Sequence, residues 1–188
     1  TTEIYTLSLH DALPICADKM TLGNFANTVT LSNIETVVGG TDDDVVTLGT
    51  ALTTGTVNLG SGDDTLTLGN FANTLTVSSV ETLTGGTGTD VVTLGTAITT
   101  GTVDLAGGTL DVLTLGAAAN TLTVTNVESV VGGASADIVT VGTALTGTVN
   151  LNAGADTLVL GDFANTVTIL NVETVTGGTS ADVLTIGA

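Results

Sequence analysis

Carboxylates that return at regular intervals are the residues of this sequence best suited to chemistry. Eight aspartates each stand before a short run of apolar residues or threonine that ends in glycine: Asp18, Asp44, Asp64, Asp90, Asp111, Asp137, Asp156 and Asp182. A long step of constant length, as from Asp18 to Asp44, alternates with a shorter and slightly variable step, as from Asp44 to Asp64. Carboxylate and carbonyl oxygens are the ligands that Ca²⁺ prefers, at about six to eight per ion. Carboxylates repeated in this way are therefore candidate ligands for a divalent cation.

Charge supports this hypothesis but leaves a second one open. The chain has 19 acidic residues and a single Lys or Arg, for a net charge of -18. If the eight aspartates stack one per coil, neighbours about 5 Å apart repel by roughly 1 kcal/mol in water and by several at an effective dielectric constant of about 20. A bridging cation would relieve that repulsion. Alternatively, each side chain accepts backbone N–H bonds within its own turn, as turn aspartates commonly do.

Other kinds of chemistry find no support in the composition. The only histidine is His10 and the only cysteine is Cys16, so no catalytic His pair, zinc spacing or disulfide framework exists. We expect no enzyme, and no nucleic-acid binding because phosphate contacts need Lys and Arg. No apolar run approaches the roughly 18 residues of a membrane-spanning helix. Four glutamates that recur once every two aspartate steps are predicted to form a solvated row: Glu35, Glu81, Glu128 and Glu173.

A long internal repeat organises the chain. The phrase LGNFANT begins at Leu22 and Leu68, and returns as LGAAANT at Leu115 and as LGDFANT at Leu160. Successive starting points are about 46 residues apart, and we call this unit, which contains two aspartate steps, the long repeat. A nearly fixed period of this size is typical of solenoid proteins, in which each unit buries its apolar side against the next.

Each aspartate step reads as β-structure. The second and fourth residues after every aspartate are apolar, the residue between them is threonine in seven of eight cases, and the fifth is always glycine. Alternation with a period of two places the apolar pair inside and the threonine outside. We therefore predict an all-β parallel β-solenoid with alternating coils of about 20 and about 26 residues. The longer step is expected to add a third short strand, and a β-sandwich or barrel is the alternative.

One turn carries a complete family motif. Residues 85–93 read GGTGTDVVT, which matches the nine-residue pattern of calcium-binding β-helix repeats. At these residues the chain resembles the hemolysin-type (RTX) repeat family and the Thr-rich bacterial β-strand repeat proteins. The resemblance implies that Asp90 is a carboxylate ligand of Ca²⁺ and that Gly85, Gly86 and Gly88 form the turn. It extends the same role, with weaker motif agreement, to the other seven aspartates. It also implies export to the cell surface or outside the cell.

The first fifteen residues differ from the rest. TTEIYTLSLHDALPI resembles a translated sequencing adapter, and all fifteen codons of one reading frame match. We expect residues 1–15 to be non-native and residues 16–188 to be a single β-solenoid region of an environmental fragment truncated at both ends. A genuine capping segment or a degraded signal peptide is the alternative.

Three functional hypotheses follow. The first is a structural or adhesive, calcium-binding segment of a large secreted bacterial protein, in contact with neighbouring repeats and with a cell surface or matrix. The second is an ice-binding ladder of outward threonines. Such a face needs two parallel rows, and the T-x-T phrases at Thr28/Thr30, Thr74/Thr76, Thr121/Thr123 and Thr166/Thr168 recur only once per long repeat. The third is the passive repeat region of a toxin or hydrolase.

Overall fold

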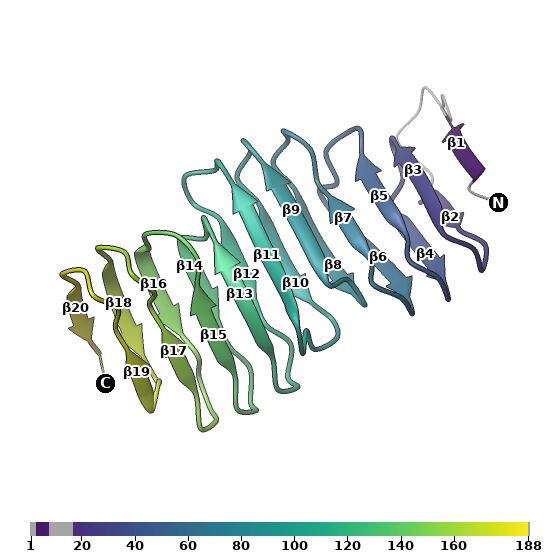
Figure 1. Cartoon of the computed structure of the whole chain (residues 1–188). Helices are drawn as coiled ribbons and strands as arrows, with labels where there is room; N and C mark the ends of the chain where they lie inside the picture. Colours follow the sequence, from purple (N-terminus) through teal and green to yellow (C-terminus); the bar gives the residue numbers. More distant parts are fainter. Residues whose placement is uncertain (1–2, 8–16, 188) are drawn as a thin grey trace.

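Two parallel sheets, wound as one solenoid, make up the molecule (Figure 1). The computed structural model describes residues 3–7 and 17–187, which contain twenty strands and no helix. Odd-numbered strands form one ten-stranded sheet and even-numbered strands form the other, so the chain crosses between the sheets after every strand. This confirms the predicted all-β parallel β-solenoid. We call the two layers the odd sheet and the even sheet.

The strands are short. The odd sheet contains β1 (Glu3–Leu7), β3 (Asn27–Leu31), β5 (Val45–Leu48), β7 (Thr65–Thr67), β9 (Thr82–Gly86), β11 (Gly101–Ala106), β13 (Thr121–Thr125), β15 (Ile138–Val141), β17 (Thr157–Val159) and β19 (Thr174–Thr176). The even sheet contains β2 (Lys19–Thr21), β4 (Thr36–Gly40), β6 (Gly55–Gly60), β8 (Thr74–Ser78), β10 (Val91–Leu94), β12 (Val112–Thr114), β14 (Ser129–Val131), β16 (Thr146–Asn150), β18 (Thr166–Leu170) and β20 (Val183–Ile186).

The strand register corrects the predicted coil lengths. One coil separates Asn27 from Asp44 by 17 residues, and the next separates Asp44 from Asp64 by 20 residues. The strand pairs β3–β5 and β5–β7 have the same two offsets, and the other pairs from β2 onward repeat either the shorter offset or one close to the longer. The predicted alternation of coil lengths is therefore wrong. The expected third strand is confirmed, because the step from Asp18 to Asp44 contains β2, β3 and β4 and is one and a half coils long.

Five strands per repeat give two and a half coils, so successive repeats begin on opposite sheets. Asn27 of the first LGNFANT phrase opens β3 in the odd sheet, whereas the second phrase leads into β8 in the even sheet. The aspartates consequently divide between two corners and do not stack one per coil in a single column. Four precede odd strands, namely Asp44, Asp64, Asp137 and Asp156; the other four precede even strands, namely Asp18, Asp90, Asp111 and Asp182.

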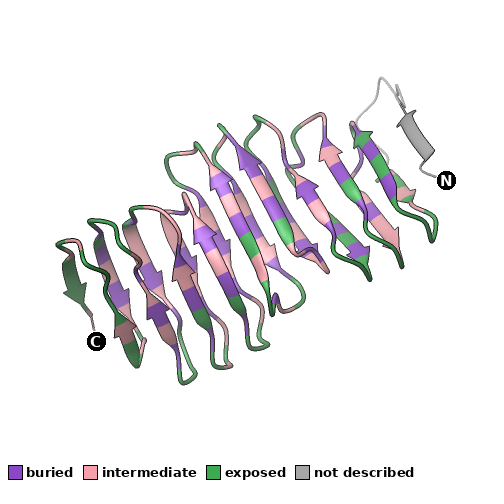
Figure 2. Cartoon of the chain, in the orientation of Figure 1, coloured by how far each residue is buried: buried purple, intermediate pink, exposed green. Residues whose placement is uncertain are grey.

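A narrow apolar core lies between the sheets, and burial alternates along most of the strands from β3 to β18 (Figure 2). Leu66 is fully buried and Leu83 is 1% exposed, which is worth about 1.5–3 kcal/mol for each such side chain. The predicted inward positions are buried after all six aspartates from Asp44 to Asp156. In β20 the equivalent residues Leu184 and Ile186 are exposed, because β20 pairs only with β18. Nine strand spacings of ~4.8 Å make the rod about 43 Å long.

The corners that follow β3, β8, β13 and β18 turn through one left-handed residue. Asn33, Ser79, Asn126 and Asn171 have φ angles between 50° and 55°. Asparagine tolerates this conformation better than most residues, because its short polar side chain can hydrogen-bond locally. The backbone N–H of Asn126 donates to Oγ1 of Thr143 in the next coil at 3.0 Å. In the described residues there is no helix of the length and apolarity needed to cross a membrane.

Candidate functional site

Polar side chains stack along both corners at which the chain enters a strand, and we call these stacks the odd ladder and the even ladder. The odd ladder contains, coil by coil, Asn27, Asp44, Asp64, Glu81, Ile98, Asn120, Asp137, Asp156 and Glu173. The even ladder contains Asp18, Glu35, Leu52, Asn73, Asp90, Asp111, Glu128, Leu145, Asn165 and Asp182. Both follow one order, which is apolar, Asn, Asp, Asp, Glu. The order returns after five coils, which is the length of two long repeats.

Beginning with Glu35 in the even ladder and Asp44 in the odd ladder, each ladder carboxylate accepts a backbone N–H from the preceding coil. Asp44 Oδ1 accepts the N–H of Asn27 at 3.0 Å, and Asp64 Oδ1 accepts the N–H of Asp44 at 2.7 Å. The N–H of Asp64 donates in turn to Oε2 of Glu81 at 2.8 Å. The same bonds recur at Asp90, Asp111, Glu128, Asp137, Asp156, Glu173 and Asp182. A buried N–H needs an acceptor, and these side chains provide one where the backbone ladder is interrupted.

The glutamates are part of the ladders, so the predicted solvated row is wrong. Oε2 of Glu35, Glu81, Glu128 and Glu173 accepts the N–H of an aspartate in the preceding coil at 2.7–2.8 Å. Each long repeat has one such glutamate, and from Glu81 onward it follows a pair of aspartates in the ladder. Their distance from the aspartates in sequence is always 17 residues. That is the shorter coil length, which becomes visible only once the strand register is known.

Asparagines begin each polar run, and none of them was predicted to be a site residue. Asn73 Oδ1 accepts the N–H of Leu52 at 2.9 Å, while its Nδ2 donates to the carbonyl oxygen of Phe71 and to Oδ1 of Asp90, both at 2.8 Å. Asn73 is 1% exposed, so all these bonds are protected from water. The available signal was the invariant Asn of the LGNFANT phrase, which recurs at Asn27, Asn73, Asn120 and Asn165.

The aspartates of the inner coils are enclosed, and in five of these six residues one carboxylate oxygen lacks a partner among the described residues. Asp44, Asp64, Asp90, Asp111, Asp137 and Asp156 are at most 1% exposed. Within the described residues, Oδ2 of Asp44, Asp64, Asp90, Asp111 and Asp156 is buried without a hydrogen bond. Burial disfavours the charged form, and it raises the pKa of Asp64, Asp90, Asp111 and Asp156 although N–H donors act in the opposite direction.

Glycines make room for these carboxylates. A Cβ atom on Gly85 would lie 2.8 Å from Oδ2 of Asp90, and one on Gly108 would overlap the carboxylate of Asp111. A Cβ on Gly86 or Gly88 would overlap backbone atoms of the preceding coil. The nearby backbone N–H of Gly86 opposes the rise in the pKa of Asp90. The Gly-Gly part of the motif therefore allows the turn to close over an inward-pointing aspartate.

This geometry bears on the predicted calcium ligands. Six of the eight aspartates have one oxygen bonded to a backbone N–H and the other enclosed, while Asp18 and Asp182, near the two ends of the ladder, are half-buried. Ca²⁺ takes about six to eight oxygen ligands. Across residues 17–187 no group of three or more Asp, Glu, His or Cys side chains is placed to hold a metal ion. The corner residues, as they lie, do not fit an open calcium site, and calcium binding stays a prediction.

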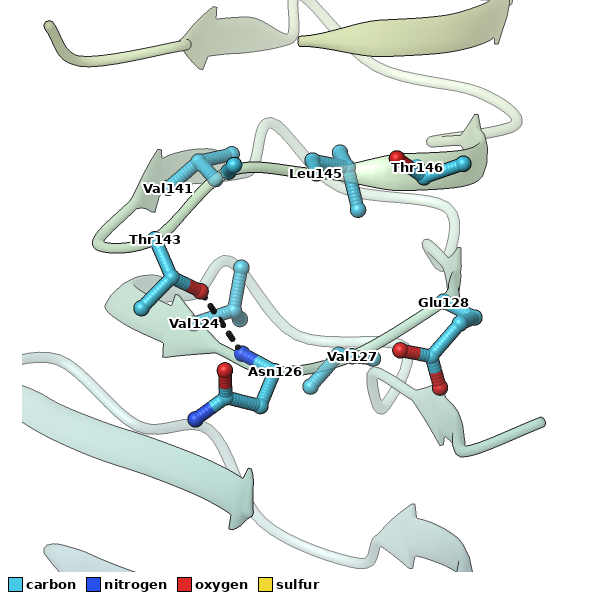
Figure 3. Close-up of a pocket in the computed structure, with 9 residues that line it drawn as sticks. Val124, Asn126, Val127, Glu128, Val141, Thr143, Leu145 and Thr146 are labelled. Carbon is cyan, nitrogen blue, oxygen red and sulfur yellow. Dashed lines mark hydrogen bonds between the residues drawn. The ribbon is translucent and has the colours of Figure 1, made fainter. Parts of the chain in front are cut away.

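Hollows in the described surface are small or open. Figure 3 shows the space between two coils next to Asn126 and Thr143, with Val124 and Leu145 on its walls. Its volume of about 10 Å³ is close to that of one water molecule. A wider, open hollow of about 360 Å³ lies beside Leu110 and Glu128, across the starts of β12, β14 and β16.

Comparison with known proteins adds no relative. No family model, no curated protein and no solved structure matches this chain.

Proposed function

We propose that this chain is a structural repeat segment, a stiff spacer in an exported bacterial protein, and that its ladder carboxylates replace backbone acceptors at the corners. The observation that carries the proposal is the unbroken stacking of two ten-stranded sheets with a polar ladder along each corner. Each coil contacts only its neighbours, so repeats can be added without a new core. A rod of this kind holds two parts of a protein at a fixed distance and carries out no reaction itself.

Export and a surface location are part of the same proposal. A single cysteine and a net charge of -18 suit a chain that stays dispersed and needs no reducing compartment. The resemblance of residues 85–93 to RTX repeats points the same way. Antibody labelling of intact cells that carry the gene tests the location, and signal only after lysis would contradict it.

Calcium is the point at which two versions of the proposal differ. In the first version, the N–H bonds to Asp44, Asp64, Asp90 and Asp111 satisfy the corners and the rod folds without metal. In the second, the RTX-like version, Ca²⁺ binds at the same aspartates and drives folding. We favour the first because an aspartate that accepts a buried N–H and is sealed by the next coil offers no ligand to an ion from solution.

The deciding experiment is a calcium titration of the full chain, monitored by far-UV circular dichroism and by calorimetry. We expect a β-rich spectrum in chelator and a melting temperature that calcium leaves unchanged. Small-angle X-ray scattering under the same conditions should give an elongated particle. A coil-to-β transition that follows added calcium would overturn the metal-free version. A compact, spherical particle would overturn the spacer function in either version.

A matched pair of variants identifies the oxygen that matters. Asp90→Asn keeps an acceptor for the N–H of Asn73 but removes the negative charge that Ca²⁺ requires. Asp90→Ala removes both. We expect Asp90→Asn to fold and Asp90→Ala to be destabilised, whereas equal loss of folding in both variants would favour the calcium version.

A further inference from the structure

The outer face of the odd sheet carries two parallel rows of threonine. From β3 to β13 the strand register aligns Thr28, Val45, Thr65, Thr82, Thr102 and Thr123 in the first row. It aligns Thr30, Thr47, Thr67, Thr84, Asp104 and Thr125 in the second. Ten of these twelve positions are threonine. The objection that T-x-T occurs only once per repeat is therefore wrong for this face, because different strands of three successive repeats supply the pairs.

The hydroxyl groups of this threonine face are available to a ligand. The eight threonines between Thr47 and Thr125 lie on strands whose neighbours are all described, and none of their hydroxyls hydrogen-bonds to a described residue. Thr82 and Thr102 are exposed, and Thr65 and Thr84 are half-buried. Each side chain also presents a methyl group. The face thus repeats one hydroxyl and one methyl at nearly every point of a two-dimensional grid.

The threonine face is almost free of charge in a very acidic molecule. The only ionisable group among its twelve positions is Asp104, whose Oδ1 already accepts the N–H of Ala106 and the Nδ2–H of Asn126. The other acids of the inner coils lie mainly in the ladders and the loops, although the chain as a whole carries a net charge of -18. An uncharged face with regularly spaced groups is complementary to an uncharged ligand whose groups are also regularly spaced.

The even sheet provides an internal comparison. It has one continuous threonine row over the same length, formed by Thr36, Thr56, Thr76, Thr93 and Thr114. The positions beside this row are Val38, Asn58 and Ser78 on one side and Thr74, Val91 and Val112 on the other. β-propensity favours threonine on both sheets equally. It does not account for a second row, with threonine at five of six positions, on one sheet alone.

From this grid we propose that the odd-sheet threonine face binds ice. Neighbouring threonines are ~4.8 Å apart along the rod and about 6.7 Å apart along a strand, because these are the strand spacing and twice the rise per residue. Both distances are close to repeat distances between water oxygens in hexagonal ice. A rigid grid of hydroxyls and methyls holds water in lattice positions before ice is met, so little order is lost on contact. The occupant is ordered water, and this activity is additional to the spacer function.

Ice activity of the purified full chain is the test. We expect thermal hysteresis and partition of the protein into a growing ice front. The double variant Thr65→Lys, Thr82→Lys places two charges in adjacent coils of the first row and should lose most of both effects. The matched control Thr56→Lys, Thr76→Lys changes adjacent coils of the even sheet and should retain them. Val45→Thr completes the first row, and it should increase hysteresis.

Folding is checked separately by far-UV circular dichroism and thermal melting of each variant, so that loss of the fold is not mistaken for loss of binding. Absence of hysteresis in the folded parent chain overturns the proposal. Equal loss in the odd-sheet and even-sheet variants also overturns it. If binding to crystalline cellulose or chitin depends on the odd sheet while ice activity is absent, the face belongs to a polysaccharide ligand and the ice proposal is wrong.

Discussion

At the scale of a residue, Asp64 illustrates what a ladder aspartate does. It accepts the N–H of Asp44 through Oδ1 and donates its own N–H to Glu81, yet its Oδ2 is buried without a partner among the described residues. Burial raises its pKa first of all, and the nearby carboxylates of Asp44, Glu81 and Asp43 add to that effect. The rod therefore carries partly compensated acids in its interior.

The raised pKa predicts how stability depends on pH. Because the folded state holds the Asp64 proton more tightly than the unfolded state does, stability falls as pH rises from the ordinary aspartate pKa of 3.8 through the folded value. Asp90, Asp111 and Asp156 contribute in the same direction. We expect the melting temperature to rise as the pH is lowered from about 7.5 to about 4.5. Differential scanning calorimetry across this range measures it, and a decrease on acidification would contradict the buried ladder.

The variant Asp64→Asn isolates one residue of that effect. An amide can still accept the N–H of Asp44, and Asn73 shows that an amide fits such a corner. We expect Asp64→Asn to melt higher than the parent at neutral pH and to show a flatter pH dependence. Asp64→Ala is the control, since it leaves the Asp44 N–H buried without an acceptor at a cost of about 1–3 kcal/mol. A lower melting temperature for the Asn variant at neutral pH would show that the charge stabilises the corner.

Part of the site was predictable from the sequence. The spacing of the eight aspartates and the glycines beside Asp90 identified the polar corners correctly. The direction of the side chains was not predictable, because an aspartate beside glycine reads the same whether it points to solvent, to a metal ion or to the next coil. The role of Asn73 was hidden for a related reason. Its partners Leu52 and Asp90 are 21 and 17 residues away, and only the register reveals those separations.

At the scale of an element, the left-handed corners show how local conformation and stacking cooperate. Asn126 Nδ2 donates to Oδ1 of Asp104, and Asn171 Nδ2 donates to Oδ1 of Asn150, both at 2.8 Å. Ser79 occupies the same kind of corner with a φ of 53°, but its side chain is too short for this bond. The equivalent partner in the coil before it is Asn58, which pairs with Ser78.

Ser79→Asn should therefore stabilise the corner. The new side chain tolerates the left-handed backbone and reaches Asn58, which is worth about 1 kcal/mol for a new hydrogen bond. Urea denaturation monitored by circular dichroism gives the free energy of unfolding. Ser79→Ala serves as the control and should not gain stability. If the Asn and Ala variants unfold at the same urea concentration, the bond to Asn58 does not form.

Close stacking of coils makes another element-scale prediction. A Cβ on Gly147 would overlap the carbonyl oxygen of Glu128, which accepts the N–H of Thr148 at 2.9 Å. Gly147→Ala should cost about 1–3 kcal/mol by overpacking. Gly107→Ala is the matched control, because the nearest atom to its Cβ is 3.6 Å away, and it should be nearly neutral. If the Gly147→Ala and Gly107→Ala variants melt at the same temperature, the coils move apart at Gly147 without a cost in free energy.

The strands themselves were largely predictable, but the coils were not. Alternation of Leu66 and Leu68 with threonine identified an inward face, and those side chains are fully buried. The coil length was misjudged because the repeated marker, an aspartate followed by an apolar pair, falls on strands of both sheets. Because the marker lies at either of two corners, consecutive markers are separated either by one coil or by one and a half coils. The sequence contains no sign of which sheet a strand joins, since both sheets bury the same residue types.

At the scale of the whole molecule, two and a half coils per repeat set the length of the rod and the side on which each feature appears. One added repeat moves every later strand to the opposite sheet. Two added repeats make five whole coils, so the later strands return to their original sheets. The threonine face shows this combination. Its strands β3, β5 and β7 come from one repeat, β9 and β11 from the next and β13 from a third, so the face depends on successive repeats being in phase.

Rod length tests this geometry directly. Four extra copies of residues 22–67, inserted after Thr67, add ten coils and should lengthen the rod by about 48 Å at ~4.8 Å per coil. Two coils per repeat would instead give about 38 Å. Electron microscopy or small-angle scattering of the parent and the extended chain measures the difference. Because four is an even number, the extension also returns β9 to the odd sheet, so the original threonine rows should continue in phase on either side of the insert.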